Sequence, residues 1–118
     1  MNSAGPGFAV LYRWRLVEGA DASFIEAWSR VSARLLSERG SLGSRLHRGP
    51  DGIWYSYAQW PSAEARQRAF AAGPVDPQAA RQMADAIAES FPEIILEPVA
   101  DYMAVTAAAG AAAPAQAE

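Results

Sequence analysis

Only one side chain in the sequence, His47, belongs to the residue type that titrates near neutral pH, so it is the first candidate for acid–base chemistry. A metal ion at this position would need further ligands. The chain has no second histidine, no cysteine and, close to His47, no acidic residue except Asp51. We therefore predict no metal site. His47 is either a catalytic proton acceptor or an ordinary, partly exposed residue at the end of a strand.

Tryptophan and tyrosine side chains form the second candidate group. Strand alternation places Tyr12 and Trp14 on one face, and Trp28 falls on the apolar side of the helix that follows. The rings predicted to wall a substrate pocket are those of Tyr12, Trp14, Trp28, Trp54 and Trp60. Such a set favours a small, flat aromatic ligand over a charged metabolite. Core packing without a ligand would use the same residues.

Alternation also separates two pairs of rings in a later strand. Tyr55 and Tyr57 point to the face opposite Trp54 and Trp60, so one pair should meet a partner sheet. The sequence alone does not say which pair this is.

Arg13 and Arg15 alternate away from Tyr12 and Trp14 on the first strand. We assign both arginines to a dimer interface, paired with carboxylates such as Glu97 or Asp101. The alternative role is a clamp for an oxyanion or a carboxylate.

Composition limits the class of protein. A net charge of −3 argues against nucleic acid as a partner. The chain shows no signal-peptide pattern and no apolar run of about 20 residues, so we expect a cytoplasmic protein without a membrane span. Glycine-rich nucleotide loops and the serine-hydrolase and zinc-protease motifs are absent from the sequence, and we expect no cofactor.

The elements that would position these residues follow from periodicity, turns and caps. We predict strands over 8–17, 42–48, 53–60 and 93–105, and helices over 23–39, 62–71 and 77–91. Asp21 or Ser23 would cap the first helix, with Ser23 and Glu26 at capping-box spacing. Pro92 would stop the last helix.

This order is β-α-β-β-α-β, an α+β arrangement of the ferredoxin-like type. Helices would cover one face of a four-stranded antiparallel sheet. The other face, which carries Leu11, needs its own cover, and a second copy of the sheet would supply it, which predicts a homodimer. One domain would span 8–105, with 1–7 and 106–118 as flexible termini.

Three stretches of the sequence resemble the antibiotic biosynthesis monooxygenase family. They are Tyr-Arg-Trp-Arg-Leu-Val-Glu-Gly at 12–19, Gly-Ser-Leu-Gly-Ser-Arg-Leu-His-Arg at 40–48 and Asp-Gly-Ile-Trp-Tyr-Ser-Tyr-Ala-Gln-Trp-Pro-Ser at 51–62. The resemblance implies a dimeric α/β-barrel with a pocket between each sheet and its own helices. Haem-degrading relatives use an asparagine on the first strand, but the only asparagine here is Asn2, so we set haem degradation aside.

The resemblance further implies a cofactor-independent oxygenase that acts on a polycyclic phenol, an anthrone or a quinol. That chemistry needs a proton acceptor, donors for an oxyanion and aromatic walls. His47 would be the acceptor. The alternative is a non-catalytic dimeric module that binds an aromatic metabolite.

Overall fold

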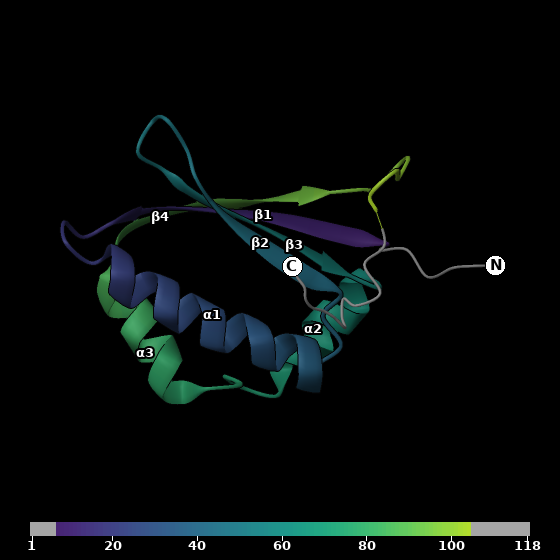
Figure 1. Ribbon diagram of the computed structural model, residues 1–118. Coiled ribbons are helices and arrows are strands. Elements are labelled where there is room, and N and C mark those ends of the chain that lie inside the picture. Colours follow the sequence, from purple (N-terminus) through teal and green to yellow (C-terminus); the bar gives the residue numbers. More distant parts are fainter. Residues whose placement is uncertain (1–6, 105–118) are drawn as a thin grey trace.

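The structure is a computed structural model that describes residues 7–104 of the 118-residue chain. The termini predicted to be flexible therefore lie outside the described residues, apart from Gly7. In chain order the elements are β1 (Phe8–Leu16), α1 (Asp21–Glu38), β2 (Gly43–Arg48), β3 (Trp54–Trp60), α2 (Ala63–Ala71), α3 (Pro77–Ala86) and β4 (Ile87–Leu96). The strands form one antiparallel sheet in the order β2-β3-β1-β4, and all three helices lie on one side of it (Figure 1). The predicted ferredoxin-like α+β fold is confirmed.

The boundary between the last helix and the last strand differs from the prediction. We expected a helix to continue to Phe91 and stop at Pro92, but α3 ends at Ala86 and β4 already begins at Ile87. The four-residue step from Ile87 to Phe91 fits one helix face and also one strand face, so the apolar pattern could not separate them. Pro92 is tolerated because β4 is an edge strand and its register with β1 shifts between Leu11 and Arg13.

The predicted strand over 93–105 is wrong in its second half. β4 ends at Leu96, and residues 97–104 have no regular secondary structure. The pairing of Ala9 with Leu96 is the last contact of the ladder between β1 and β4. Beyond that pair the chain leaves the sheet (Figure 1).

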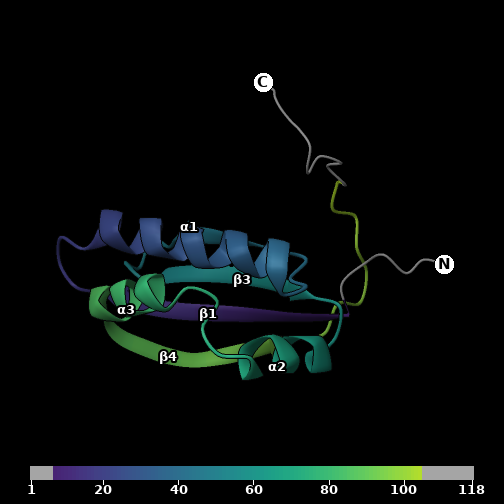
Figure 2. The same cartoon turned by 90° about the horizontal axis from the view of Figure 1, so that it is seen from below.

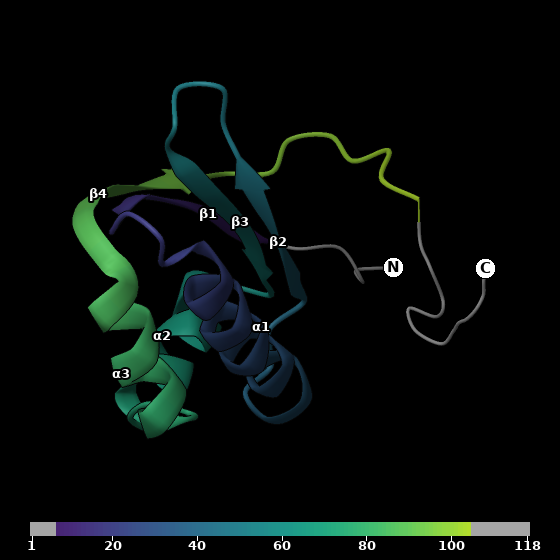
Figure 3. The same cartoon turned by 60° about the vertical axis from the view of Figure 1, so that its left-hand side comes forward.

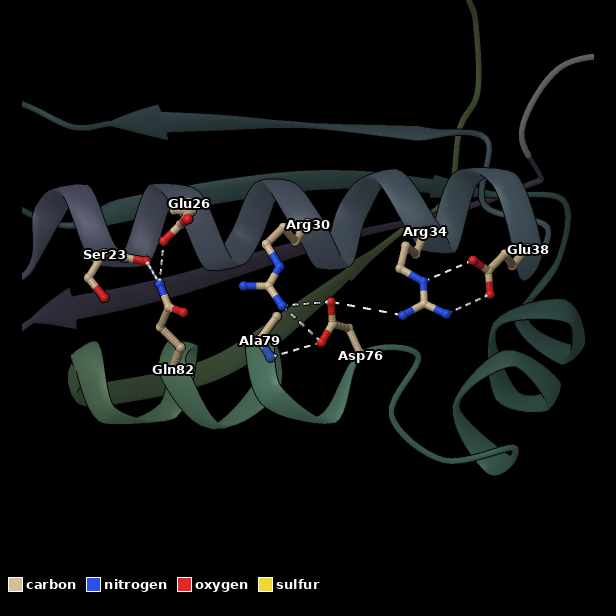
Figure 4. A network of polar contacts seen from close by, with 8 residues as sticks. All are labelled: Ser23, Glu26, Arg30, Arg34, Glu38, Asp76, Ala79 and Gln82. Carbon is tan, nitrogen blue, oxygen red and sulfur yellow. Dashed lines mark hydrogen bonds and ion pairs between the residues drawn. The ribbon is translucent and has the colours of Figure 1, made fainter.

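The start of α1 also corrects the prediction. The helix begins at Asp21 behind Ala20, and no side chain caps it, so the Ser23–Glu26 capping box does not form. Both residues instead bind the amide of Gln82 on α3, which donates to the Ser23 carbonyl oxygen at 3.0 Å and to Glu26 Oε1 at 2.9 Å (Figure 4). A contact between two helices thus replaces a local cap.

The hydrophobic core lies between the sheet and the α1–α3 pair. Phe24 on α1 is fully buried. Its ring centroid lies 5.1 Å from that of Trp14 and 5.9 Å from that of Trp54, and both pairs meet edge to face. Ala86 completes this buried cluster. Figure 2 shows α1 running along the sheet, with α3 beside it near one end and α2 near the other end. The aromatic cluster therefore anchors the helix layer at one end.

Strand register decides which rings face the helices. In β3, Trp54, Ser56, Ala58 and Trp60 are buried, and the residues between them are only partly buried. Trp54 pairs with Trp14, which is in the core, whereas Tyr55 pairs with Arg13. The tryptophan pair therefore faces the helices, and Tyr55 and Tyr57 lie on the open face.

Asp76 ties the start of α3 to α1 (Figure 4). Its carboxylate accepts the Ala79 backbone N–H at 3.0 Å, binds Arg30 Nη2 at 3.2 Å and lies 3.9 Å from Arg34 Nη1. The backbone N–H bond, then the Arg30 and Arg34 charges, hold the pKa of Asp76 below its usual value. The ionised form of Asp76 is therefore more stable in the folded state than in the unfolded chain.

We predict that Asp76→Ala lowers the melting temperature at pH 7 by a few degrees, because it removes the cap of α3 and its link to α1. Because its pKa is lower in the folded state, the ionised Asp76 carboxylate stabilises the fold above the unfolded-state pKa of about 3.9. This stabilisation is lost as the pH falls through the lower folded-state pKa. The difference between variant and parent should therefore shrink on acidification to pH 3. Asp85→Ala, at an exposed position of the same helix, is the matched control. Equal melting curves for Asp76→Ala and the parent at pH 7 would contradict the prediction.

Candidate functional site

A groove of about 470 Å³ runs between α1 and the edge strand β2. It combines aromatic and aliphatic walls with basic and hydroxyl groups. The lining residues are Ile25, Trp28, Ser29, Ser44, Arg45, Leu46, His47, Arg48 and Trp54. Its volume lies within the range of about 300–1,000 Å³ that is typical of small-molecule sites.

The groove brings together three of the residues singled out in the sequence: His47, Trp28 and Trp54. His47 is exposed on β2, and its register partner is Tyr55 on the open face of the sheet. Its side chain therefore lies on the open face and borders the groove only across the edge of β2, while Leu46 points toward the helices and packs on the core. Of the three residues, His47 is the only one with an ionisable side chain.

Contacts with the core fix Trp28 and Trp54, the two tryptophans of the groove wall. Trp28 packs against the core and donates its Nε1–H to Ser56 Oγ at 3.1 Å, and Ser56 is only 2% exposed. Trp54 is 6% exposed and is fixed by Phe24. Both indoles are thus fixed by packing or a hydrogen bond, and the half-buried Trp28 gives a flat ligand a rigid surface to stack on.

Positive charge lines one side of the groove. The guanidinium of Arg48 lies over the Trp54 ring, 4.8 Å from its centroid, and its only ion pair among residues 7–104 is a long one, 3.9 Å, to Asp21. Arg45 and His47 also border the groove, but their register partners Tyr57 and Tyr55 place both side chains on the open face of the sheet. A chain with a net charge of −3 therefore presents a locally basic margin here, which would attract an anion.

A second polar cluster lies on the same face of the sheet, beneath α2. Arg66 donates to the Tyr12 hydroxyl from Nε at 3.2 Å and from Nη2 at 3.0 Å, and Nη2 also binds Glu93 Oε1 at 2.7 Å. Burial raises the pKa of Tyr12, and the adjacent Arg66 partly offsets that effect. Because Arg66 fills the acceptor positions of the Tyr12 oxygen, the Tyr12 proton is free to donate to another group.

Strand register connects the cluster with the groove. Leu46 pairs with Ser56, and Ser56 pairs with Tyr12, so these three side chains form one row across the sheet. Trp28 reaches this row from α1, and Arg66 reaches it from α2. Sequence reasoning missed the contact between Arg66 and Glu93, because it placed Glu93 at the start of a strand rather than inside one.

The remaining predicted pocket residues pack in the interior. Trp14 belongs to the buried core cluster, and its ring stacks on Tyr12 at 5.8 Å. Trp60 is 1% exposed and meets Phe70 edge to face at 5.8 Å. Its indole N–H is buried without a hydrogen-bond partner among the described residues. Neither tryptophan lines the groove.

Arg13 and Arg15 lie on the open face, but their partners differ from those predicted. Arg13 donates to the Pro92 carbonyl at 2.8 Å, and Arg15 forms a 3.0 Å ion pair with Glu89. Both guanidinium groups also lie near the Phe91 ring. β4 begins earlier than predicted and brings Glu89 opposite Arg15. The pairing of these arginines with Glu97 or Asp101 at a dimer interface stays a prediction.

Two further properties concern only residues 7–104. Within them, no three acidic or histidine side chains lie close enough together to hold a metal ion. No helix in this part of the chain is long and apolar enough to cross a membrane.

The sequence matches no protein-family model, and a comparison with curated protein sequences also gives no match. The fold, in contrast, is similar to several solved structures. SnoaB, a cofactor-independent oxygenase from Streptomyces nogalater, has a TM-score of 0.66 at 21% identity, over 80% of this chain and 95% of its own. A candidate antibiotic biosynthesis monooxygenase from Caulobacter crescentus CB15 has a TM-score of 0.69 at 16% identity, over 81% and 92% of the two chains. A third protein, from Chloroflexus aurantiacus J-10-fl and named in the same way, gives 0.65 at 16% identity, over 81% and 96%. The chain therefore has the antibiotic biosynthesis monooxygenase fold.

We predict that Trp28 and Ser56 are energetically coupled. Trp28→Phe and Ser56→Ala each remove the 3.1 Å hydrogen bond. The double variant should therefore lose less free energy of unfolding than the two single variants together, by about 0.5–1.5 kcal/mol. Urea unfolding of the four proteins measures this coupling. Ser29→Ala, at an exposed neighbouring position, should change the free energy of unfolding by less than about 0.5 kcal/mol. Strict additivity would show that the bond contributes nothing in solution.

Proposed function

We propose that the protein is a cofactor-independent oxygenase that acts on a polycyclic phenol, an anthrone or a quinol bound in the groove between α1 and β2. The observation that carries the proposal is the composition of the groove. Two indoles and Arg48 lie on the helix side of a space of about 470 Å³, and His47, the single histidine of the chain, and Arg45 border it from the open face of the edge strand. These are the parts that deprotonation of a flat aromatic substrate requires.

The groups have separate roles in the proposed reaction. For an anthrone, His47 takes a proton from the substrate, and Arg48 stabilises the resulting oxyanion. The carbanion gives an electron to O₂, and recombination forms a hydroperoxide. Loss of water then leaves a carbonyl. One oxygen atom enters the product and the other leaves as water, so the substrate supplies all four electrons and no further reductant is required.

The shared fold supports this choice of chemistry. SnoaB, whose structure superposes on most of this chain, is itself a cofactor-independent oxygenase. The alternative is a non-catalytic module that binds an aromatic metabolite. It is favoured by the solid packing of Trp14, Phe24 and Trp54, which leaves the groove rather than the core interior as the place for a ligand.

We also propose that the protein is a homodimer. The sheet face away from the helices is rich in apolar and aromatic side chains, and among them Ile94 is 39% and Leu96 37% exposed. The side chains of this open face are Leu11, Tyr55, Tyr57, Phe91, Ile94 and Leu96. A second copy of the same face would bury them reciprocally around a two-fold axis.

Purified protein, without added flavin, nicotinamide or metal, should accelerate oxygen uptake by an anthrone or a hydroquinone. His47→Ala should lower that rate by about 10²–10⁴-fold, the usual contribution of a general base. Quenching of tryptophan fluorescence by a non-oxidisable anthraquinone should persist in His47→Ala, because Trp28 and Trp54 still form the walls. Ser29→Ala is the control at the margin of the groove.

Three results would count against parts of this assignment. Quenching without oxygen uptake in the parent across phenols, anthrones and quinols would favour the binding module. A parental rate in His47→Ala, with a strong loss in Tyr12→Phe, would move the chemistry to the Arg66 cluster. No quenching and no uptake would exclude the groove as a site for flat aromatic compounds.

The dimer proposal is tested by light scattering coupled to size-exclusion chromatography at micromolar concentration. The parent should have twice the mass of one chain. Ile94→Glu should reduce the mass to that of a monomer, because it places a charge in the apolar open face. Leu36→Glu, at a position on α1 that is 56% exposed, should leave the dimer intact. A parent that elutes as a monomer would refute the proposal.

A further inference from the structure

Arg48 is the basic side chain on the helix side of the α1–β2 groove. Its register partner on β3 is Trp54, which is buried against Phe24 of α1, so alternation turns Arg48 toward the helices as well. Figure 3 shows the edge strand β2 with α1 in the layer of helices beneath the sheet. Arg48 is the last residue of β2 and therefore stands at the end of the groove where the hairpin turn begins.

The Arg48 guanidinium is positioned by contacts that leave its hydrogen-bond donors available. Its Cζ atom lies 4.8 Å from the centroid of the Trp54 ring, and a guanidinium over an aromatic ring keeps its N–H groups for other partners. The Asp21 carboxylate is 3.9 Å away, which is too long for a hydrogen bond. Both charged side chains are more than half exposed. An oxyanion can therefore bind Arg48 without breaking a strong native contact.

The other charged groups near this end of the groove face away from it. Arg45 and His47 lie on the open face of the sheet. Asp51, in the hairpin turn, accepts a hydrogen bond from Tyr55 on that same face. Glu26 on α1 accepts a hydrogen bond from α3. On its helix side β3 carries only tryptophan, serine and alanine, none of which ionises.

We propose that the groove binds its phenolic substrate as the oxyanion rather than as the neutral phenol, and that Arg48 makes this selection. The ring system stacks on Trp28, which is held by its hydrogen bond to Ser56, and the ionised oxygen accepts hydrogen bonds from Arg48. The hydroxyl proton goes to solvent. Removal of the next proton, from carbon in an anthrone or from the second hydroxyl of a quinol, remains the role of His47. This selection rests on the proposed function and adds the ionisation state of the substrate to it.

The direction of the expected effect separates Arg48 from the charge of the whole chain. A net charge of −3 disfavours a further negative charge and would raise the pKa of a bound phenol. A guanidinium within hydrogen-bond distance lowers that pKa. Asp21 opposes Arg48, because its carboxylate competes for the same cation. A bound phenol with a pKa below that of the free compound therefore indicates a local effect of Arg48.

A pH titration of a bound, coloured phenol tests the selection without turnover. The probe is 2-hydroxyanthraquinone, whose visible absorption changes when its hydroxyl ionises, and anthraquinone is the reference that cannot ionise. With the parent in excess, the pKa of the probe should be lower than in buffer by about half a unit or more, which corresponds to roughly threefold or tighter binding of the ionised form. Binding of anthraquinone should stay constant over the same pH range. An unchanged or raised pKa of the bound probe would overturn the proposal.

Substitutions of the two charged residues should move the pKa of the bound probe in opposite directions. Arg48→Gln should raise it to the value in buffer or above, and Arg48→Lys should keep only part of the shift, because an ammonium lacks the planar fork. Asp21→Asn should lower it further, because the competing carboxylate is gone. Arg68→Gln and Asp85→Asn make the same charge changes at exposed positions of α2 and α3, and should leave the pKa within about 0.2 units of the parent.

Arg45→Gln tests whether the face of the strand matters. It removes the same charge from β2, but on the open face, and should raise the pKa of the bound probe by much less than Arg48→Gln does. Equal effects of the two substitutions, or a lowered pKa that persists in Arg48→Gln, would assign the selection to the general field of the protein and overturn the role of Arg48.

Failure of the selection can be distinguished from failure of the proposed reaction. A lowered probe pKa without oxygen uptake would retain the selection of the oxyanion and reject only the oxygenase. A parental rate of oxygen uptake in Arg48→Gln, together with an unshifted probe pKa in the parent, would reject the selection alone. If neither anthraquinone nor the probe quenches the tryptophan fluorescence of the parent, the groove is not a site for flat aromatic compounds, and both proposals are refuted.

Discussion

The packing of Phe24 between Trp14 and Trp54 is the contact on which the rest of the helix layer depends. It fixes α1 over the central strands β1 and β3, where each edge-to-face pair contributes roughly 0.5–1.5 kcal/mol beyond simple burial. Because α1 is anchored there, it does not fully cover the edge strand β2. The α1–β2 groove is therefore a consequence of how the core packs.

The same packing explains why the groove is both apolar and basic. Trp54 presents one side of its ring to Phe24, and Arg48 lies over the ring as well. Alternation along β2 turns Leu46 and Arg48 toward the helices and turns Arg45 and His47 toward the open face. An edge strand beside a helix thus generates hydrophobic walls with cationic groups next to them. Arg48 is the basic group on the helix side of this surface, over the Trp54 ring.

Much of the fold could be predicted from the sequence because its signals are local. The alternation in β1, the Gly-Pro-Asp-Gly turn before β3 and the Asp76–Pro77 helix start each depend on a few neighbouring residues. The start of β4 was missed because Ile87 and Phe91 satisfy both the helical and the strand period. That single error also concealed the ion pairs of Arg15 with Glu89 and of Arg66 with Glu93 within the chain. Contacts between distant segments depend on register, which local patterns do not contain.

The site presents a physical conflict between access and protection. A carbanion reacting with oxygen needs a space from which water is largely excluded, because desolvation strengthens the electrostatic stabilisation of the oxyanion. The half-buried Tyr12–Arg66 cluster has part of that protection, whereas the groove is accessible and lies at the edge of the sheet. An accessible groove can become protected only if another segment covers it. If the groove is the site of oxygenation, protection of the carbanion from water therefore depends on a segment that covers the groove.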